Sequence, residues 1–362
     1  MIDSRDVLSR FFNGSPETRA NAERFMLGGN NEKRYLFGRS EVSAGLARVV
    51  DIDGFVDDFT QDKEWLGKPI FKATDIALDS LVVNCVLCIH PVSAHKKLES
   101  SGLSNILAFS DLYRHFPEKI RLPTFSVSAN NDLIKHSCEW SYIYNSLADE
   151  ESRKVLSDIL KFRLTLDYRG MSGYEFRPEE QYFEGFMSYS NEVFVDAGAF
   201  DGETTKLFCS RFPDYRRVYV FEPIADSMIK ARANLNSFRD IQFINKGVSD
   251  SAGSLCFRSA SGSANAVDEE DGDSYIDVVT IDKQIDDRVT FIKMDLEGWE
   301  RKALIGARHK ITTEKPKLAI AVYHAIEDFR EVFKYVKSLR PEYKVYLRHY
   351  TEGWSETIMY FK

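Results

Sequence analysis

The sequence predicts an α/β protein with two parallel-sheet domains. Short apolar runs of strand length alternate with segments of helical spacing in both halves of the chain. This alternation is typical of parallel strands joined by helical crossovers. The chain has 362 residues, which suits two domains better than one. Its hydrophobic fraction of 43% is enough for two ordinary packed cores.

The first domain is expected over residues 1–116. The predicted strands are Arg34–Gly38, Ile52–Asp58, Leu81–Cys88 and Ile106–Phe109. The predicted helical segments are 1–32, 44–50 and 91–100. Cys85 and Cys88 lie three residues apart in one strand-like run, so they would point to opposite faces and could not share a metal ion. We therefore predict a buried structural role for this pair.

Residues 117–190 change character and are predicted to form a helical linker. Within them, Asp149–Tyr168 is expected to be a helix. Acidic residues at its start favour a helix N-terminus, and its apolar residues recur at helical spacing. Two interpretations remain open: a packing helix between the domains, or a lid over the site of the second domain.

The second domain is expected over residues 191–362. Its predicted strands are 192–196, 217–221, 241–245, 289–294, 317–323, 343–349 and 356–361. Gly353 lies in a short loop between the last two, which predicts an antiparallel hairpin. Helix 326–339 carries a clean apolar stripe. Residues 259–274 are rich in Ser, Gly, Ala and acidic residues and are predicted to be a flexible surface loop.

Charge and composition disfavour two classes of partner. The formal net charge is −8 and no long run of Lys or Arg occurs, whereas nucleic-acid binding needs a basic surface. No apolar run reaches membrane-spanning length, and the first residues lack a signal-peptide core. Five irregularly spaced cysteines favour a reduced, cytoplasmic protein. A homo-oligomer is left open.

The strongest motif runs from Val193 to Thr204, where an apolar strand leads into an acidic, glycine-bearing turn and then a helix. Glycines let the backbone turn tightly and approach a ligand, and a helix N-terminus offers free N–H groups to a carboxylate. An acid before the first glycine suits a ligand with an amino group better than a pyrophosphate. The predicted ligand-binding residues of this turn are Asp196, Gly198, Ala199, Phe200, Gly202 and Thr204. The bland alternative is a plain strand–turn–helix.

Two further strand ends carry acids. Glu222, followed by Pro223, ends the second strand of the domain, where an acid accepts hydrogen bonds from ribose hydroxyls. Asp295 and Glu297 follow the fourth strand and would face the ligand cleft. They would orient an acceptor, act as a base or hold a divalent cation, unless one of them merely caps a helix.

A histidine ends the fifth predicted strand. His324 would also open onto the cleft, and an ordinary histidine pKa near ~6.5 suits a general base. A structural histidine is the competing interpretation. Arg348, with His349 beside it, is a weaker candidate for the acceptor site.

Taken together, these residues resemble the FkbM family of methyltransferases. The matching pieces are Phe194–Ala199, Phe221–Pro223, Gly247–Asp250, Ile292–Gly298, Lys317–His324 and Leu347–Tyr350. The resemblance implies a Rossmann-like class I methyltransferase domain, with a seven-stranded sheet that ends in an antiparallel hairpin. It also implies S-adenosylmethionine as donor and O-methylation of sugar or polyketide-type hydroxyls. Asp196, Gly198 and Glu222 would hold its methionine and ribose, and Asp250, beside Ser249, would lie near its adenine.

The first domain resembles the small Rossmann-like N-terminal domains of bacterial sugar acyltransferases. The match runs from Tyr35–Gly38 through Gly54–Asp58 and implies binding of a nucleotide-linked sugar. The loop Gly38–Gly45 lacks the internal glycines expected for phosphate binding. A scaffold or oligomerisation domain is therefore an equal alternative.

The predicted function is an S-adenosylmethionine-dependent O-methyltransferase whose acceptor is a small molecule or glycan, with the methylated hydroxyl on a sugar or glycosylated metabolite. A neutral alcohol is a poor nucleophile, so His324 or Asp295 would remove its proton. The alternative is a nucleotide-sugar-binding or scaffold protein with an inactive methyltransferase domain. The intact Asp196, Glu222 and Asp295 argue against that alternative.

Overall fold

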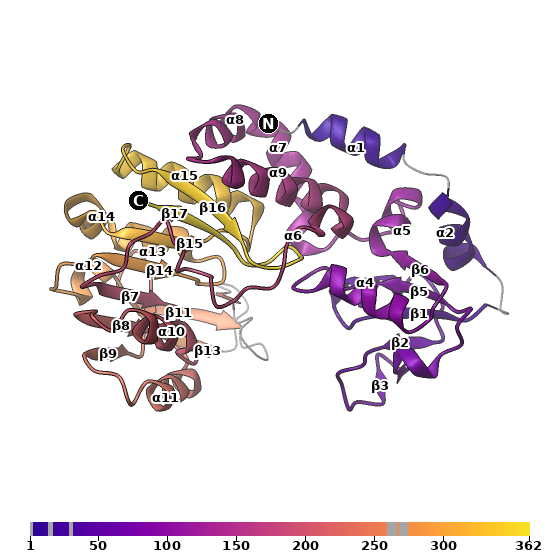
Figure 1. Cartoon of the computed structure of the whole chain (residues 1–362), viewed down its shortest axis with the longest axis horizontal. Helices are drawn as coiled ribbons and strands as arrows, with labels where there is room; N and C mark the ends of the chain where they lie inside the picture. The colour runs from indigo at the N-terminus through magenta and orange to yellow at the C-terminus, as the bar shows by residue number, and fades with distance from the viewer. Residues whose placement is uncertain (1–2, 14–16, 29–31, 259–265, 268–273) are drawn as a thin grey trace. The chain divides into compact units, whose positions relative to one another are not determined.

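The computed structural model describes residues 3–13, 17–28, 32–258, 266–267 and 274–362 (Figure 1). The chain folds into two compact units. Unit 1 comprises Met1–Trp140, Lys154–Phe176 and Tyr350–Ser355, and unit 2 comprises Ser141–Arg153, Arg177–His349 and Glu356–Lys362. The segment 117–190, which we expected to be a separate linker, is thus shared between the two units. No helix in the described part of the chain is both long and apolar enough to cross a bilayer.

Unit 1 is built on a six-stranded sheet of order β3-β4-β2-β1-β5-β6. Its strands are β1 Arg34–Phe37, β2 Gly54–Val56, β3 Glu64–Trp65, β4 Lys68–Phe71, β5 Leu81–Asn84 and β6 Asn105–Ala108. The four predicted strands are confirmed, and all pair in parallel. The short, polar, half-exposed β3 and β4 were not predicted, because their sequence carries no apolar alternation.

The third predicted strand ends earlier than expected. Asn84 closes β5, because its side-chain amide donates to the carbonyl of Pro91 and accepts from the N–H of Val86. Cys85 still donates its N–H to the carbonyl of Phe37, and the chain then turns toward the next helix. Cys85 is fully buried, whereas Cys88 is only partly buried and its thiol donates to Ser355 Oγ at 3.4 Å.

The helices of unit 1 connect and flank this sheet. They are α1 Ser4–Phe12, α2 Glu17–Leu27, α3 Glu41–Leu46, α4 Pro91–Ser100, α5 Phe109–His115, α6 Thr124–Val127 and α7 Ala129–Lys135, with short 3₁₀ turns η1 Ala73–Asp75 and η2 Tyr168–Met171. α3 begins at a reciprocal capping box between Ser40 and Ser43. α4 begins with Pro91, which has no N–H to satisfy at a helix start. Helices α8 Ser137–Ser146 and α9 Glu150–Thr165 run across the boundaries between the units.

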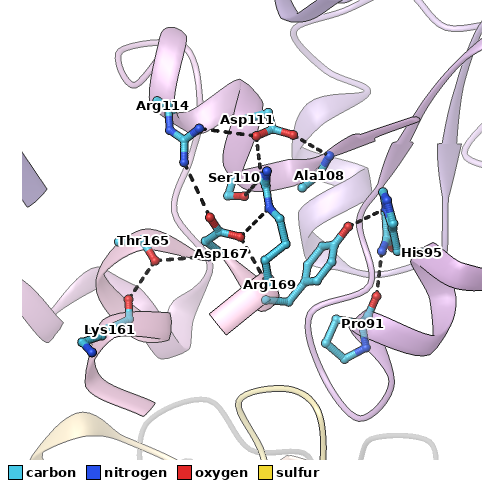
Figure 2. Close-up of polar contacts among 12 residues, drawn as sticks. Pro91, His95, Ala108, Ser110, Asp111, Arg114, Lys161, Thr165, Asp167 and Arg169 are labelled. Atoms are coloured by element: carbon cyan, nitrogen blue, oxygen red, sulfur yellow. Dashed lines mark hydrogen bonds and ion pairs between the residues drawn. The ribbon is translucent and has the colours of Figure 1, made fainter. Parts of the chain in front are cut away.

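A polar network ties η2 to α4 and α5 in unit 1 (Figure 2). Arg169 donates to Asp111, to Ser110 Oγ at 3.3 Å and to Asp167 at 2.8 Å. Tyr168 bonds His95 Nδ1 at 2.7 Å. Because Asp111 is buried, its pairing with Arg169 satisfies a charge that water cannot reach. The network fixes the segment that follows α9.

Unit 2 is built on a seven-stranded sheet of order β16-β17-β15-β14-β7-β8-β9. Its strands are β7 Val193–Ala197, β8 Arg217–Phe221, β9 Ile241–Ile244, β14 Phe291–Met294, β15 Lys317–Ala321, β16 Val345–His349 and β17 Thr357–Phe361. Five strands are parallel, and β17 pairs antiparallel to both β15 and β16. The predicted strands and the terminal hairpin are confirmed, and the sheet is that of a class I methyltransferase.

A second, smaller sheet in unit 2 was not predicted. It has the order β10-β13-β11-β12, with β10 Gly247–Val248, β11 Gly253–Arg258, β12 Ala266–Val267 and β13 Ser274–Val279. Ala266–Val267 and Ser274 fall within the stretch 259–274 that we expected to be a loop. The rest of that stretch lies outside the described residues.

The helices of unit 2 connect the strands of its sheets. They are α10 Glu203–Arg211, α11 Ala225–Asn234, α12 Ile281–Gln284, α13 Glu300–Gly306, α14 Arg308–Glu314 and α15 Ile326–Leu339. The apolar stripe predicted for α15 is buried at Ile326, Phe329, Val332, Phe333 and Val336. Aromatic rings form the centre of the core, where Phe194 stacks on Phe291 with centroids 4.9 Å apart. This packing fixes β7 beside β14.

Candidate active site

The turn after β7 is a tight glycine turn. Gly198 and Gly202 have φ of +81° and +84°, in the left-handed region that favours glycine. A Cβ at Gly198 would lie 1.9 Å from the backbone oxygen of Asp295, so the turn lies directly against the chain that leaves β14. Gly202 is the N-cap of α10 and supplies no side-chain hydrogen bond to that helix. Asp201 Oδ1 accepts from the N–H of Glu203 at 3.3 Å, so one N–H group at the start of this helix is already bonded.

Asp196 lies beneath this turn rather than in an open cleft. It is fully buried, 2.9 Å from Lys293 Nζ, and it accepts a hydrogen bond from Thr205 Oγ1 at 2.7 Å. Burial opposes the charge on Lys293, but Asp196 raises the pKa of the amine. Lys293 also donates to the carbonyl of Gly198 at 2.8 Å. Lys293 therefore has a structural role beneath the turn, whereas a direct contact of Asp196 with a ligand stays a prediction.

Glu222 ends β8 and is held by the same turn. Its two carboxylate oxygens accept from the N–H groups of Phe200 at 2.9 Å and Ile224 at 2.8 Å. Burial raises the pKa of Glu222. Phe200 has φ of +50° and a side chain 37% exposed. The carboxylate is thus oriented in advance, with lone pairs left for ribose-type hydroxyls.

The remaining predicted cofactor residues occupy neighbouring positions. Ala199 N–H, like that of Gly198, donates to the carbonyl of Phe221 at the end of β8. Ser249 is buried; its hydroxyl accepts from the indole of Trp299 at 3.1 Å and lies 3.2 Å from the carboxylate of Asp250, which is exposed. Thr204 lies on α10 beside Thr205, and Pro223 follows Glu222. In this turn the threonine that bonds Asp196 is Thr205, which the sequence analysis missed.

A histidine and several carboxylates meet where β14 and β15 end. These strands are parallel neighbours, so their following residues share one edge. His324 Nε2 lies 3.5 Å from Asp295 Oδ1 and 3.3 Å from Glu297 Oε2. His324 Nδ1 lies 3.4 Å from Glu300 Oε1. The structure therefore brings the predicted His324, Asp295 and Glu297 together, and it adds Glu300.

The cluster has further polar neighbours that the sequence did not suggest. Asp295 accepts from the hydroxyl of Tyr182 at 2.7 Å and from that of Tyr323 at 3.3 Å. Gln181 donates to Glu356 at 2.6 Å. Burial, and then the charge of Asp295, raise the pKa of Glu356 to about 7. Their sequence signal is weak, because Gln181 and Tyr182 lie outside any periodic element.

The surroundings of His324 shift its pKa in opposite directions. Burial alone would lower this pKa, but the carboxylates of Glu300, Glu297 and Asp295 raise it well above the ordinary value. This direction opposes the ordinary pKa that we assumed for a general base, and the role of His324 as that base stays a prediction.

Arg348 does not join this cluster. It is 5% exposed and pairs with Asp149 at 2.7 Å, while it also donates to Ser152 Oγ at 2.9 Å. The side chain is committed to the N-terminal end of α9. These contacts favour a structural role, and the assignment of Arg348 to the acceptor site stays a prediction. His349 is likewise bonded to Thr357 Oγ1 at 2.9 Å.

This geometry agrees with comparisons to known proteins. Residues 196–344 match the methyltransferase FkbM domain. The methyltransferase FkbM of Methylobacillus flagellatus KT is similar in structure, with 26% identity, a TM-score of 0.76, and coverage of 99% of this chain and 97% of that one. The domain match and the fold support a methyltransferase. No curated protein sequence matches this chain.

Two other solved structures match about half of this chain with lower TM-scores. A Streptococcus mutans protein solved with SAH has 19% identity and a TM-score of 0.32, over 48% of this chain and 89% of that one. Fibrillarin of Aeropyrum pernix, solved with natively bound S-adenosyl-L-methionine, has 12% identity and a TM-score of 0.33, over 48% of this chain and 67% of that one.

Proposed function

We propose that this protein transfers a methyl group from S-adenosylmethionine to a hydroxyl oxygen of a sugar or glycosylated small molecule. One observation carries the proposal. The glycine turn at Gly198 lies against the backbone of Asp295, so the predicted cofactor cradle and the histidine–carboxylate cluster share one edge of the sheet. A methyl donor and an acceptor must meet at such an edge.

The residues of unit 2 fit the donor chemically. The glycine turn before α10 allows close approach of a ligand to the backbone, and the oriented Glu222 suits ribose hydroxyls. S-adenosylmethionine supplies an electrophilic methyl group when it is bound. Lys293 and Asp196 stabilise the turn, because Lys293 donates to the carbonyl of Gly198 and pairs with Asp196.

The acceptor hydroxyl must lose its proton as it is methylated. We assign proton acceptance to a carboxylate of the cluster, Asp295 or Glu297. Asp295 already receives the hydroxyl hydrogen bonds of Tyr182 and Tyr323. Several acceptors in one small space suit a polyhydroxylated substrate, since each hydroxyl brings a donor.

Unit 1 is proposed to be a scaffold rather than a nucleotide-sugar site. The N-terminus of α4, where parallel sheets bind phosphates, is occupied by a carboxylate of the same chain. Glu352 accepts hydrogen bonds from the N–H of Ser93, at 2.7 Å, and from its hydroxyl. The neighbouring Gly353 lies against the backbone of Cys88 so closely that a Cβ would be 1.2 Å from its carbonyl oxygen.

The test is calorimetric titration of S-adenosylmethionine into the full chain, followed by transfer of labelled methyl to a panel of glycosylated acceptors. We expect binding, and a product whose new methyl group lies on oxygen by NMR. Absence of cofactor binding would overturn the donor assignment. Methyl found on nitrogen would overturn the acceptor class alone.

A further inference from the structure

We propose that the cluster after β14 and β15 is a binding site for a divalent first-row transition metal ion, held by Asp295, Glu300 and His324. One ligand atom from each of these residues lies within 4.8 Å of the others. Ligand atoms on opposite sides of a divalent ion are about 4 to 5 Å apart, from metal–oxygen distances of about 2.0 to 2.6 Å. The spacing therefore admits an ion with little rearrangement.

The polar atoms of the cluster are incompletely satisfied. Glu300 is fully buried, yet among the described residues its Oε2 has no hydrogen-bond partner. Both ring nitrogens of His324 likewise lack one, although carboxylates face them at 3.3 to 3.5 Å. Buried polar atoms of this kind carry a desolvation cost unless a partner is present. A metal ion would supply that partner for Glu300 and for one ring nitrogen of His324, while the other ring nitrogen keeps its facing carboxylate.

The charge balance points the same way. Asp295, Glu297, Glu300 and Glu356 lie around a single His324, and the charge of nearby Lys293 is already matched by Asp196. The cluster thus holds an excess of carboxylates, of which Glu300 is fully buried and Asp295 and Glu297 are partly exposed. A divalent cation would offset this excess, as buried carboxylates generally require.

The donor set indicates the class of ion. One imidazole nitrogen with two carboxylates suits Mn²⁺, Fe²⁺ or Zn²⁺ better than Ca²⁺, which prefers oxygen ligands alone. The two faces of His324 are both approached by carboxylates, an arrangement that also orients ligating histidines in metal sites. This inference deepens the proposed function: the ion would bind the acceptor hydroxyl and lower its pKa. Asp295 is then a ligand, and Glu297 is the neighbouring carboxylate that takes the hydroxyl proton.

The experiment is Mn²⁺ titration of the chelator-treated, metal-free full chain, followed by electron paramagnetic resonance. We expect one bound ion per chain, and a nitrogen coupling from imidazole in the pulsed spectrum. His324→Gln should remove that coupling, and Glu300→Gln should weaken Mn²⁺ binding about tenfold or more. His309→Gln is the matched control, because His309 is exposed and lies on α14 outside the cluster.

Two results would overturn the site. One is no Mn²⁺ binding at millimolar concentration by chains whose circular dichroism is native. The other is binding that His324→Gln and Glu300→Gln leave unchanged. Glu300→Gln keeps an oxygen that accepts from the N–H of Leu296, so loss of binding in a folded variant reports on the metal. Titration of S-adenosylmethionine into the metal-free chain separates this result from the donor assignment.

Discussion

Removal of the buried amine at Lys293 tests the support beneath the glycine turn. In Lys293→Met the side chain keeps its length but loses its charge, so Asp196 loses its ion-pair partner at a fully buried position. Breaking a buried ion pair from one side costs about 3–5 kcal/mol. Thr205 continues to donate to Asp196, which favours the lower end of that range. We therefore expect unit 2 to lose about 3 kcal/mol of stability.

The assay is urea unfolding, with hydrogen-exchange mass spectrometry of peptides that cover β7 and β14 to localise the loss. Lys206→Met is the matched control, because Lys206 pairs with Glu203 on the exposed face of α10, where an ion pair contributes about 1 kcal/mol at most. The double change Lys293→Met with Asp196→Asn should recover part of the lost stability. A Lys293→Met chain as stable as Lys206→Met would refute the role of this pair.

Three further predictions follow from single contacts. Glu222→Ala should weaken S-adenosylmethionine binding by about 1.5–3 kcal/mol in calorimetry. Asp226, an exposed residue on α11, provides the control, and Asp226→Ala should leave the affinity unchanged. Equal affinities in both variants would remove Glu222 from the cofactor site. Gly353→Ala should lower the melting temperature of unit 1, because its Cβ would collide with the Cys88 carbonyl. Gly173→Ala serves as the control, because a Cβ at Gly173 meets nothing within 4 Å. Equal melting temperatures of the two variants would contradict the close packing at Gly353. Although burial opposes it, hydrogen bonds from Arg348 and Ser152 lower the pKa of Asp149 to about 2. The contribution of ionised Asp149 to stability is complete above the ordinary aspartate pKa near ~4 and is lost as pH falls from there toward 2. Asp149→Asn should therefore lose less stability than the unmodified chain over this pH range in acid unfolding. An unchanged acid-unfolding profile would show that the Asp149–Arg348 pair contributes nothing.

Most of the seven-stranded sheet could be predicted because its strands are buried on both faces. Phe291–Met294 and Lys317–Ala321 are apolar apart from one lysine each, which is the pattern of central parallel strands. The small sheet of unit 2 carries no such signal. Its strands are short or polar, and Gly247–Val248 has only two residues. Pairing with a distant partner, rather than local pattern, makes these residues strands.

The candidate site residues that directly follow buried strands were predicted because parallel strands end at a common edge. Asp295 and His324 do lie together at that edge, and their functional roles stay predictions. Tyr182 lies 113 positions from Asp295 in the chain and has φ of +74°, so nothing local marks it. Arg348 was harder to place, because a strand residue near such an edge can face either the cleft or a packed helix. Its ion pair with Asp149 depends on a contact between residues 199 positions apart.

The course of the chain has a consequence for how such proteins can be recombined. Unit 1 contains two later segments of the chain besides its N-terminal part, Lys154–Phe176 and Tyr350–Ser355. The second segment is the six-residue loop between β16 and β17, two strands of unit 2. That loop contributes Trp354, stacked on Phe125 with centroids 5.0 Å apart, as well as Glu352 at the start of α4. A single genetic crossover that replaced the N-terminal part of the gene would keep the original Tyr350–Ser355 loop, whose contacts with Phe125 and the start of α4 would then be made with foreign residues. Exchange of the unit between relatives therefore requires that a few codons near the end of the gene change with it.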